Sequence, residues 1–276
     1  MAAAEAPELN ESIDRNFAYI YANLEAPNWA PWLHFSEAEL AAQSHVFLDG
    51  QFELEEEDLP VAILATNRID WNGVAADLPT WDDIAGVNMT FEDTYCPQGN
   101  TLALMSMSVM SDKKGQHLPE RLIGLLKDYA VAQEVDHIIG DFRPSGFSEY
   151  KRITGDFDFT KYIGLTRPED NLPVDAWLRN VTRLGMQPLR VDNRAMVIPV
   201  SIDEFESYQQ QYQPEQWRQI TDENAIGQLM GQHQPKQDIE QISEVWECGE
   251  TGSWYVNREA GAAVYVESNL WGEISH

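Results

Sequence analysis

Strand-like and helix-like hydrophobic spacing follow each other between Leu102 and Lys151. This segment reads LALMSMSVM, SDKKGQHLP, ERLIGLLKDYAVAQEVD and HIIGDFRPSGFSEYK. The first and last parts contain apolar runs of strand length, whereas Leu122, Leu125 and Leu126 in the third lie on one face of an amphipathic helix. The pattern therefore predicts a strand, a turn, a helix and a second strand.

The turn of this segment combines positive charge with glycine. It carries Lys113, Lys114 and Gly115 and leads into a helix with Pro119 in its first turn, where the missing N–H costs least. Unpaired backbone N–H groups at a helix N-terminus carry the positive end of the helix dipole and can bind phosphate. We expect an anion-binding turn.

The first strand also carries two serines. Strict alternation places Ser106 and Ser108 on one face and Met105 and Met107 on the other. Buried hydroxyls need hydrogen-bond partners, so the serines belong either to a hydrogen-bonded core or to the lining of a polar pocket.

The rest of the chain alternates similarly between helices and strands. Asn28–Phe35 holds two tryptophans between prolines, which predicts either a packed aromatic loop or part of a pocket mouth. Glutamine-rich Gln209–Gln241 is expected to be a mobile surface segment. Helices are predicted over Ser12–Leu24, Val174–Leu184 and Ile202–Tyr212, together with a short helix capped by Thr80. A strand is predicted over Val61–Trp71, and two more around Glu259–Gly261. We also expect a loop over Asp156–Pro168 and a hairpin from Pro188–Arg190 and Ala195–Val200.

Composition narrows the functional classes. The 276 residues carry a formal charge of −28, which argues against a nucleic-acid binder and against docking on anionic lipid. There are two cysteines, Cys96 and Cys248, and no apolar run is long enough to span a membrane. The first residues lack a basic and an apolar region, so we expect no signal peptide. We expect a soluble cytoplasmic protein with an acidic surface. Its six histidines lack the spacing of a metal site, so no metal is predicted.

Two residues of the second strand are candidates for chemistry. His137 opens the strand, and a side chain with an unperturbed pKa of about 6.5 suits a general acid or base, although a structural histidine is the alternative. Arg143 follows its end, where a guanidinium can bind a carboxylate or phosphate or form a salt bridge.

The order of elements resembles the GNAT acyltransferases. Their fourth strand enters a turn of the form R/Q-x-x-G-x-G/A, whose amides hold the pyrophosphate of CoA. The counterpart here is KGQHLP, in which Lys114 takes the basic position while His117 and Pro119 replace small residues. A longer resemblance to GNAT-like proteins, including the loading domains of polyketide synthases, covers about three quarters of the chain; it is carried by PVAILATNRIDWNG, FRPSGFSEYK, PVDAWLRNVTRLGMQPL and WYVNREAGAAVYVESNLW.

The resemblance implies an α/β (α+β) fold with acyl-CoA as the acyl donor. We expect a mixed central sheet flanked by helices in a GNAT-like core over residues 1–205, and a C-terminal β-rich extension over 206–276 packed on it. Many GNAT enzymes protonate the CoA thiolate with a tyrosine four residues before the glycine that closes the late helix. That position is Val181, before Gly185, so another proton donor is required.

The candidate site residues fall into three groups. Predicted catalytic residues are His137, Arg143, Tyr150 and Ser106. Predicted cofactor-binding residues are Met110, Lys113, Lys114, Gly115, Gln116, His117 and Leu118. Predicted substrate-binding residues are Asn67, Trp71, Ser145 and Lys151.

Three functions fit these expectations. The first is acyl transfer from a CoA thioester to an amine or thiol. The second is decarboxylation of a malonyl-type thioester with S-acyl transfer to an acyl carrier protein, in which Arg143 would hold the carboxylate and His137 would protonate the enolate. The third is a non-catalytic acyl-CoA-binding module. An acidic carrier would need a basic patch, for which Lys113, Lys114, Arg121 and Lys151 are candidates. The acceptor and the oligomeric state stay open.

Overall fold

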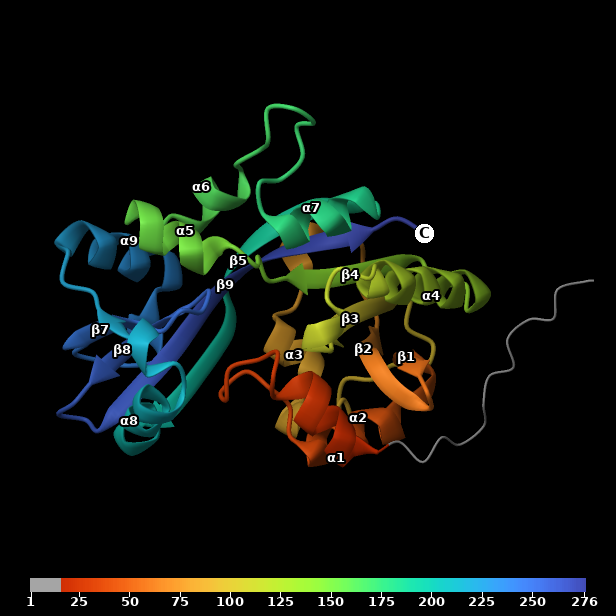
Figure 1. Cartoon of the computed structure of the whole chain (residues 1–276), viewed down its shortest axis with the longest axis horizontal. Helices are drawn as coiled ribbons and strands as arrows, with labels where there is room; N and C mark the ends of the chain where they lie inside the picture. The colour runs from red at the N-terminus through yellow and green to blue at the C-terminus, as the bar shows by residue number, and fades with distance from the viewer. Residues whose placement is uncertain (1–15) are drawn as a thin grey trace, which may run out of the picture.

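The computed structural model describes residues 16–276, and in this part of the chain one mixed sheet forms the centre of the molecule (Figure 1). Its order is β1-β2-β3-β4-β9-β8-β7-β6, with β5 also paired to β9. The strands are β1 (Gln51–Glu56), β2 (Leu59–Ile69), β3 (Thr101–Val109), β4 (His137–Phe142), β5 (Met186–Ser201), β6 (Arg218–Gln219), β7 (Glu244–Glu247), β8 (Ser253–Asn257) and β9 (Ala262–Ile274).

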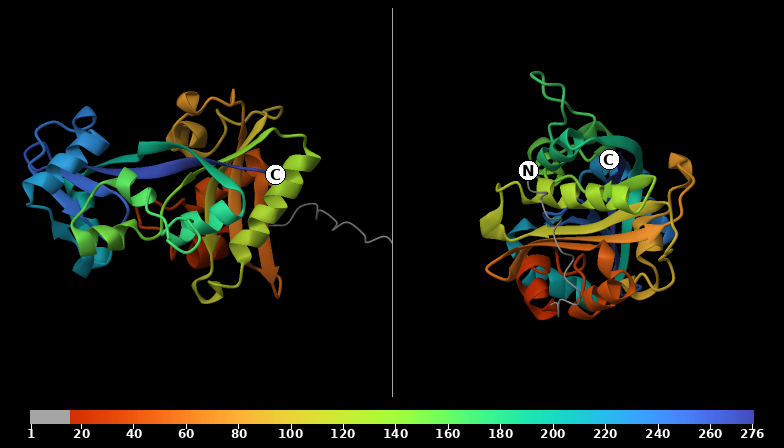
Figure 2. Two further views of the ribbon diagram at one scale, coloured as in Figure 1. Left: turned by 90° about the horizontal axis from the view of Figure 1, so that it is seen from above. Right: turned by 90° about the vertical axis from the view of Figure 1, so that its right-hand side faces the viewer.

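Helices cover both faces of the sheet formed by β1 to β4. Figure 2 shows α4 on one face and the N-terminal helices on the other. α1 continues directly into a π-helix over Tyr21–Glu25. The α-helices are α1 (Phe17–Ile20), α2 (Glu37–Val46), α3 (Trp81–Ala85), α4 (Leu118–Ala132), α5 (Phe147–Thr154), α6 (Phe159–Ile163), α7 (Ala176–Arg183), α8 (Ile202–Gln211) and α9 (Glu223–His233).

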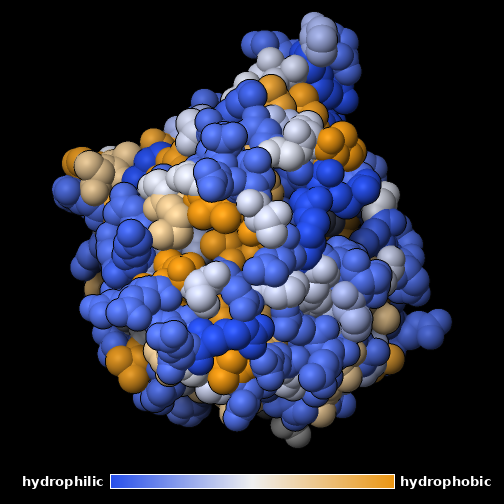
Figure 3. Space-filling model, turned by 90° about the vertical axis from the view of Figure 1, so that its left-hand side faces the viewer, coloured by the Kyte–Doolittle hydropathy of each residue, from blue (hydrophilic) through white to orange (hydrophobic). Residues whose placement is uncertain are grey.

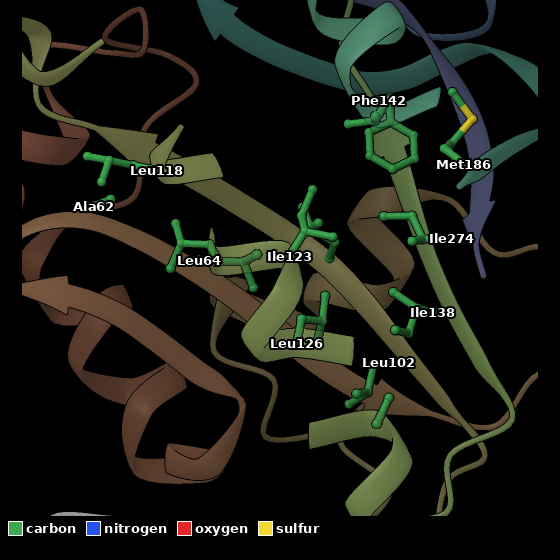
Figure 4. Packing of buried hydrophobic residues seen from close by; sticks show 14 of the residues in the cluster. Ala62, Leu64, Leu102, Leu118, Ile123, Leu126, Ile138, Phe142, Met186 and Ile274 are labelled. Atoms are coloured by element: carbon green, nitrogen blue, oxygen red, sulfur yellow. The ribbon is translucent and has the colours of Figure 1, made fainter. Parts of the chain in front are cut away.

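Each face has its own hydrophobic core. Under α4 and α7, Leu64, Ile123, Leu126 and Ile138 are fully buried or nearly so (Figure 4). The opposite core packs α1 to α3 against the sheet and includes Trp81. Removal of this apolar surface from water, at about 25 cal/mol per Å², is the main force that holds the helices on the sheet.

A β-bulge interrupts β3 in the middle. Ala65 is paired with Ser106, but the next residue of β2, Thr66, is paired with Leu104, so Met105 is the extra residue. A bulge shifts the alternation of side chains by one position. Met105 therefore packs in the core of α1 to α3 while Met107 packs against that of α4, and the prediction that both lie on one face is wrong.

β3 and β4 separate just beyond this bulge. They are parallel and paired only from Thr101 with His137 to Leu104 with Gly140. β3 then continues to Val109 and β4 to Phe142 without further pairing between them. The edges of two strands are thus left apart, which is the structural basis of the site described below.

The last strand links the two ends of the molecule. The second half of β9 pairs with β4, its first half pairs with β8, and β5 pairs with it in both halves. In Figure 1 this long strand runs from its pairing with β8 to its pairing with β4. The segment 206–276, predicted as an extension, therefore contributes β9 to the central sheet.

Two further predictions are corrected by this pairing. The hairpin expected within 188–200 is instead the single strand β5, because its partner is β9, which follows much later in the sequence. Glutamine-rich 209–241, predicted to be mobile, contains α9, whose Leu229 and His233 are buried. The apolar stripe of α9 packs on β8 and β9, which are distant in sequence.

Several local predictions are confirmed. Thr80 caps α3 and forms a reciprocal capping box with Asp83. β8 and β9 flank Glu259–Gly261 as expected, and α7 ends just before Gly185. The loop predicted for 156–168 contains the short helix α6, and the first part of the predicted helix Ser12–Leu24 lies outside the described residues. Among the helices of residues 16–276, none is long and apolar enough to cross a membrane.

Candidate functional site

A pocket of about 430 Å³ lies where β3 and β4 separate. This volume falls in the usual range for small-molecule sites, roughly 300–1,000 Å³. Five segments meet there: the loop before α2, the bulged part of β3, the turn before α4, the end of β4 with the residues that follow it, and α7. The lining residues are Asn28, Trp29, Leu104, Met105, Ser106, Met107, Val109, Lys114, Gly115, Pro119, Asp141, Phe142, Arg143, Pro144, Ser145 and Trp177.

A smaller cavity of about 40 Å³ adjoins the pocket on the side of α1 to α3. The two share Trp29, Ser106, Asp141 and Arg143, and the cavity adds Glu25 among other residues. The pocket is therefore bordered by the turn before α4 on one side and by a group of acidic side chains on the other.

The turn before α4 brings part of the predicted cofactor-binding set to the pocket. Lys114 and Gly115 line it, and Gly115 has a φ of +85°, a left-handed conformation that glycine adopts without strain. His117 also has a left-handed φ of 60° and precedes the first residue of α4. Pro119 lines the pocket in the first turn of the helix.

The other predicted cofactor-binding residues do not line the pocket. Lys113 forms an ion pair with Glu56, which raises the pKa of the lysine. His117 is exposed and its Nδ1 lies 3.0 Å from Glu120 Oε1. Met110 and Gln116 hold the turn through backbone hydrogen bonds to Val61 and Lys113, and Leu118 is buried in the core under α4.

Two buried polar atoms of the pocket have no hydrogen-bond partner within residues 16–276. These are Ser106 Oγ, on the bulged part of β3, and Asp141 Oδ1, at the end of β4. Both residues line the pocket and the adjoining cavity. Because a buried unpaired polar atom costs about 1–3 kcal/mol, such atoms are usually satisfied by water or by a ligand.

The surroundings of Asp141 favour its neutral form. Burial raises the pKa of its carboxyl group well above the ordinary value, and the negative charges of Asp192 and Glu267 add to this effect. The Asn269 amide has two possible orientations. In one, Nδ2 donates to Asp141 Oδ2 at 3.3 Å; in the other, Nδ2 donates to Glu267 Oε1 and to the carbonyl of Ser268, and the amide oxygen faces Asp141. The second orientation forms more hydrogen bonds.

Arg143 is bound by two carboxylates. Its Nε donates to Glu267 Oε1 at 2.8 Å and its Nη2 donates to Glu250 Oε2 at 2.5 Å. Tyr265 and Tyr212 donate to the second oxygens of these carboxylates, at 2.6 and 2.5 Å respectively. The guanidinium also lies over the ring of Trp29. Its charge is thus neutralised within the protein.

Glu25 provides a buried carboxylate with an unusual pKa. Burial raises this pKa from 4.5 to about 7, although hydrogen bonds from the Phe35 N–H and the Ser108 hydroxyl oppose the shift. Trp29 Nε1 in turn donates to Ser108 Oγ at 3.0 Å. Glu25 ends the π-helix, a rare element that is frequent at functional sites. Near neutral pH this carboxylate can accept and release a proton.

His137, predicted to be catalytic, lies outside the pocket lining. Its Nδ1 is 2.7 Å from Glu273 Oε1, and its ring packs edge-on against Trp71. It opens β4, four residues before Asp141, which corresponds to about 13 Å along a strand. The structure places the predicted substrate residues Asn67 and Trp71 away from the pocket as well: both are buried, and each donates to the backbone, Asn67 to Ile84 and Trp71 to Val74.

The segment after β4 reaches the pocket only through its first residues. Ser145 lines the pocket. Lys151 is fully buried and donates to the carbonyls of Glu250, Thr251 and Gly252, so it joins α5 to the β7–β8 turn. Tyr150 donates to Asp156 Oδ2 at 3.2 Å and stacks on Phe147, also outside the lining.

Sequence reasoning missed Glu25, Trp29, Asp141, Glu250 and Glu267 as site residues. The sequence signal for Asp141 was its place between an apolar strand and Arg143, where a charged residue is unusual. Glu25, Glu250 and Glu267 gave no signal among 46 acidic residues, because only the fold brings them together. In residues 16–276, no three His, Cys, Asp or Glu side chains are placed to hold a metal ion.

The fold is that of GNAT-like domains. The chain is similar to the loading GNAT-like domain of CurA from Lyngbya majuscula, with a TM-score of 0.52 and 21% identity over 63% of this chain and 81% of that one. It is also similar to the GphF GNAT-like decarboxylase, solved in complex with isobutyryl-CoA, with a TM-score of 0.50 and 19% identity over 65% of this chain and 86% of that one.

A curated protein matches part of the sequence. The arginine N-acetyltransferase avaD of Aspergillus versicolor is 26% identical over 110 residues, which are 40% of this chain and 38% of that protein. This match therefore spans well under half of either protein. No family model matches the sequence.

Proposed function

We propose that this protein is an acyltransferase that moves an acyl group from a CoA thioester to a small amine. The observation that supports this most strongly is the pocket between the separated strands β3 and β4. It is bordered by Lys114 and Gly115 on one side and by Ser106 and Asp141 on the other. A thioester held there would have its phosphates near the turn and its carbonyl carbon near the unpaired polar atoms.

CoA would be held on the side of α4. Lys114 supplies a charge without an ion-pair partner among residues 16–276, and the first turn of the 15-residue helix α4 supplies backbone N–H groups. Pro119 removes one of these donors, and Lys113 is partly neutralised by Glu56. We therefore propose that CoA is bound through fewer charged contacts than a regular glycine-rich turn provides.

The acceptor would enter from the side of Glu25. Glu25 and Glu267 line the cavity on this side, and the one guanidinium among its lining residues, that of Arg143, is already paired with Glu267 and Glu250. An excess of carboxylates favours a cationic acceptor, since opposite charges attract strongly at a partly desolvated site. Glu25 can take the proton that an ammonium must lose before it attacks a thioester. A similar protein acts on arginine, which makes L-arginine the first acceptor to test.

The alternative is a decarboxylase or S-acyltransferase that works with a carrier protein. Its support is the likeness in fold to the CurA and GphF domains. It needs Arg143 to hold a malonyl carboxylate, but Glu267 and Glu250 already occupy this guanidinium, and His137 lies outside the pocket lining. The basic patch for an acidic carrier is also reduced, because Lys151 is buried and Lys113 is paired.

The experiment is a product analysis with purified protein. Acetyl-CoA and malonyl-CoA are each incubated with L-arginine, with a panel of other primary amines and with a small thiol, and the products are identified by mass spectrometry. We expect an N-acetylated amine and free CoA in equal amounts. Conversion of malonyl-CoA to acetyl-CoA without transfer would instead support the decarboxylase, and saturable binding without turnover would support a binding module.

A further inference from the structure

We propose that Asp141 is the acid that protonates the departing CoA thiolate, the role left open by Val181. This inference rests on the proposed acyl transfer and assigns a catalytic residue to it. Val181 is fully buried in the core under α4 and α7, so the late helix presents no hydroxyl at that position. The donor must therefore come from another element that borders the pocket.

Asp141 occupies the position that this role requires. It directly follows Gly140, the last residue of β4 paired with β3, and so lies where the strands separate. Asp141 lines the same pocket as Lys114 and Gly115 of the turn. Its buried Oδ1 has no hydrogen-bond partner within residues 16–276, so a ligand bound beside it would supply the missing partner.

The surroundings of Asp141 favour its protonated form. Asp192 from β5, Glu267 from β9 and Glu25 from the π-helix add negative charge around it, and Arg190 and Arg143 add positive charge. Arg143 is neutralised by Glu267 and Glu250, and Arg190 lies 3.7 Å from Asp192. A carboxyl group in such a site stays neutral, so it can donate a hydrogen bond and a proton.

Other hydroxyl groups near the pocket are already engaged. Tyr212 and Tyr265 donate to Glu250 and Glu267, and burial and these charges raise the pKa of both tyrosines. Ser145 lies 3.5 Å from Asp175. Ser106 Oγ is unpaired but has an alcohol's weak acidity, so it is better suited to donate a hydrogen bond to the thioester oxygen.

The proton movements balance with two carboxyl groups. A cationic acceptor first gives one proton to Glu25. The nitrogen then forms a bond to the carbonyl carbon, and the carbon–sulfur bond breaks. Asp141 transfers its proton to the sulfur, which leaves as the CoA thiol, and the second proton lost by the nitrogen returns Asp141 to its neutral form. The net reaction releases one proton, which Glu25 passes to solvent.

Asp141→Asn tests the role with almost no change in shape. The matched control is Asp136→Asn, the same chemical change at an exposed carboxylate just before β4. Steady-state kinetics use acetyl-CoA with the amine found in the product analysis, or with water where hydrolysis is the only turnover. We expect Asp141→Asn to lower kcat by at least about 100-fold and to leave the KM for acetyl-CoA within about threefold. The activity of the wild type should fall at alkaline pH as Asp141 loses its proton, and this fall should be absent in Asp141→Asn.

Infrared spectroscopy tests the protonation state without any turnover. The difference spectrum of wild type minus Asp141→Asn at pH 7 should contain the carbonyl stretch of a protonated carboxylic acid, and the control difference should not. Absence of this band, or full turnover by Asp141→Asn, would overturn the inference while the acyl transfer stands. If the wild type releases no CoA from acetyl-CoA with any acceptor, the proposed function and the inference both fail.

Discussion

Arg143 and Glu267 form a buried ion pair, in which the guanidinium Nε donates to Oε1 at 2.8 Å and Glu267 is completely inaccessible to solvent. Glu250 pairs with the same guanidinium, so the positive charge of Arg143 stabilises the fold and is not available to a ligand. It thereby links the end of β4 to β9 and to the β7–β8 turn.

Removal of Arg143 is therefore expected to destabilise the protein. Arg143→Met leaves Glu267 buried without its cation, and breaking a buried pair in this way costs about 3–5 kcal/mol. Urea unfolding of Arg143→Met and of Arg152→Met measures the difference. Arg152 pairs with Glu149 on the surface, so its replacement should change stability by less than about 1 kcal/mol. Equal effects of the two changes would contradict the structural role.

Lys151 should prove structural rather than substrate-binding. Its ammonium donates to three backbone carbonyls and lies 3.4 Å from Glu247, so Lys151→Met leaves these acceptors buried and unpaired. We expect a loss of about 3 kcal/mol in the free energy of unfolding. Acetyl-CoA affinity, measured well below the melting temperature, should stay within about twofold. A selective loss of affinity with unchanged stability would restore the substrate-binding role.

The effect of Glu25→Gln on the free energy of unfolding tests the raised pKa of Glu25. The pKa of Glu25 is about 7 in the folded protein and 4.5 in an ordinary environment, so between these values the folded state binds more protons than the unfolded state. Stability from this group is therefore lost as pH rises from 4.5 to 7, by up to about 3 kcal/mol. Glutamine removes this slope and should make the variant more stable than wild type at pH 8. Parallel curves of stability against pH for wild type and Glu25→Gln would show that the pKa of Glu25 is not raised.

The same substitution tests the proposed base. Wild-type turnover should rise with pH through about 7 as Glu25 ionises, and Glu25→Gln should lose this rise together with about 10²–10⁴-fold in kcat. Because Glu25 contacts the acceptor side, the KM for acetyl-CoA is expected to change little. An unchanged rate for Glu25→Gln would remove it from the mechanism.

Adjacent lysines give a matched test of the CoA turn. Lys114 lines the pocket, whereas Lys113 is paired with Glu56. Lys114→Ala should weaken CoA binding about tenfold, which corresponds to about 1.4 kcal/mol, and Lys113→Ala should weaken it by less than about twofold. Both changes remove one positive charge, so equal losses in titration calorimetry would indicate a general electrostatic effect instead of contact at Lys114.

Local signals predicted most elements but not the arrangement of the site. The capping box of Thr80 and Asp83 and the strand β4 are encoded by neighbouring residues, and the sequence was sufficient for them. The bulge at Met105 depends on how β2 and β3 pair, so alternation along β3 alone gave the wrong face for this residue. The pairing of β5 with β9 is equally non-local and replaced the expected hairpin.

Some residues of the site could be predicted from local sequence, whereas others are brought together only by the fold. Arg143, Ser106, Lys114 and Gly115 were predicted from clear strand and turn patterns, and all four line the pocket. His137 was favoured for its ordinary pKa, but its partner Glu273 comes from the far end of the chain. Glu25 and Asp141 acquire unusual pKa values only through burial, which no single segment of sequence reveals.

Calorimetric titration of acetyl-CoA into wild type and Ser106→Phe tests whether the pocket between β3 and β4 binds the thioester, because a phenylalanine at this lining position would take up part of the pocket. Lys114→Glu serves as a second blocking variant at the exposed turn, and thermal melts verify that each variant is folded. We expect saturable one-to-one binding by wild type and a loss of at least about tenfold in affinity, or about 1.4 kcal/mol, for both variants. Absence of saturable binding by wild type, or equal affinity of all three proteins, would contradict this expectation.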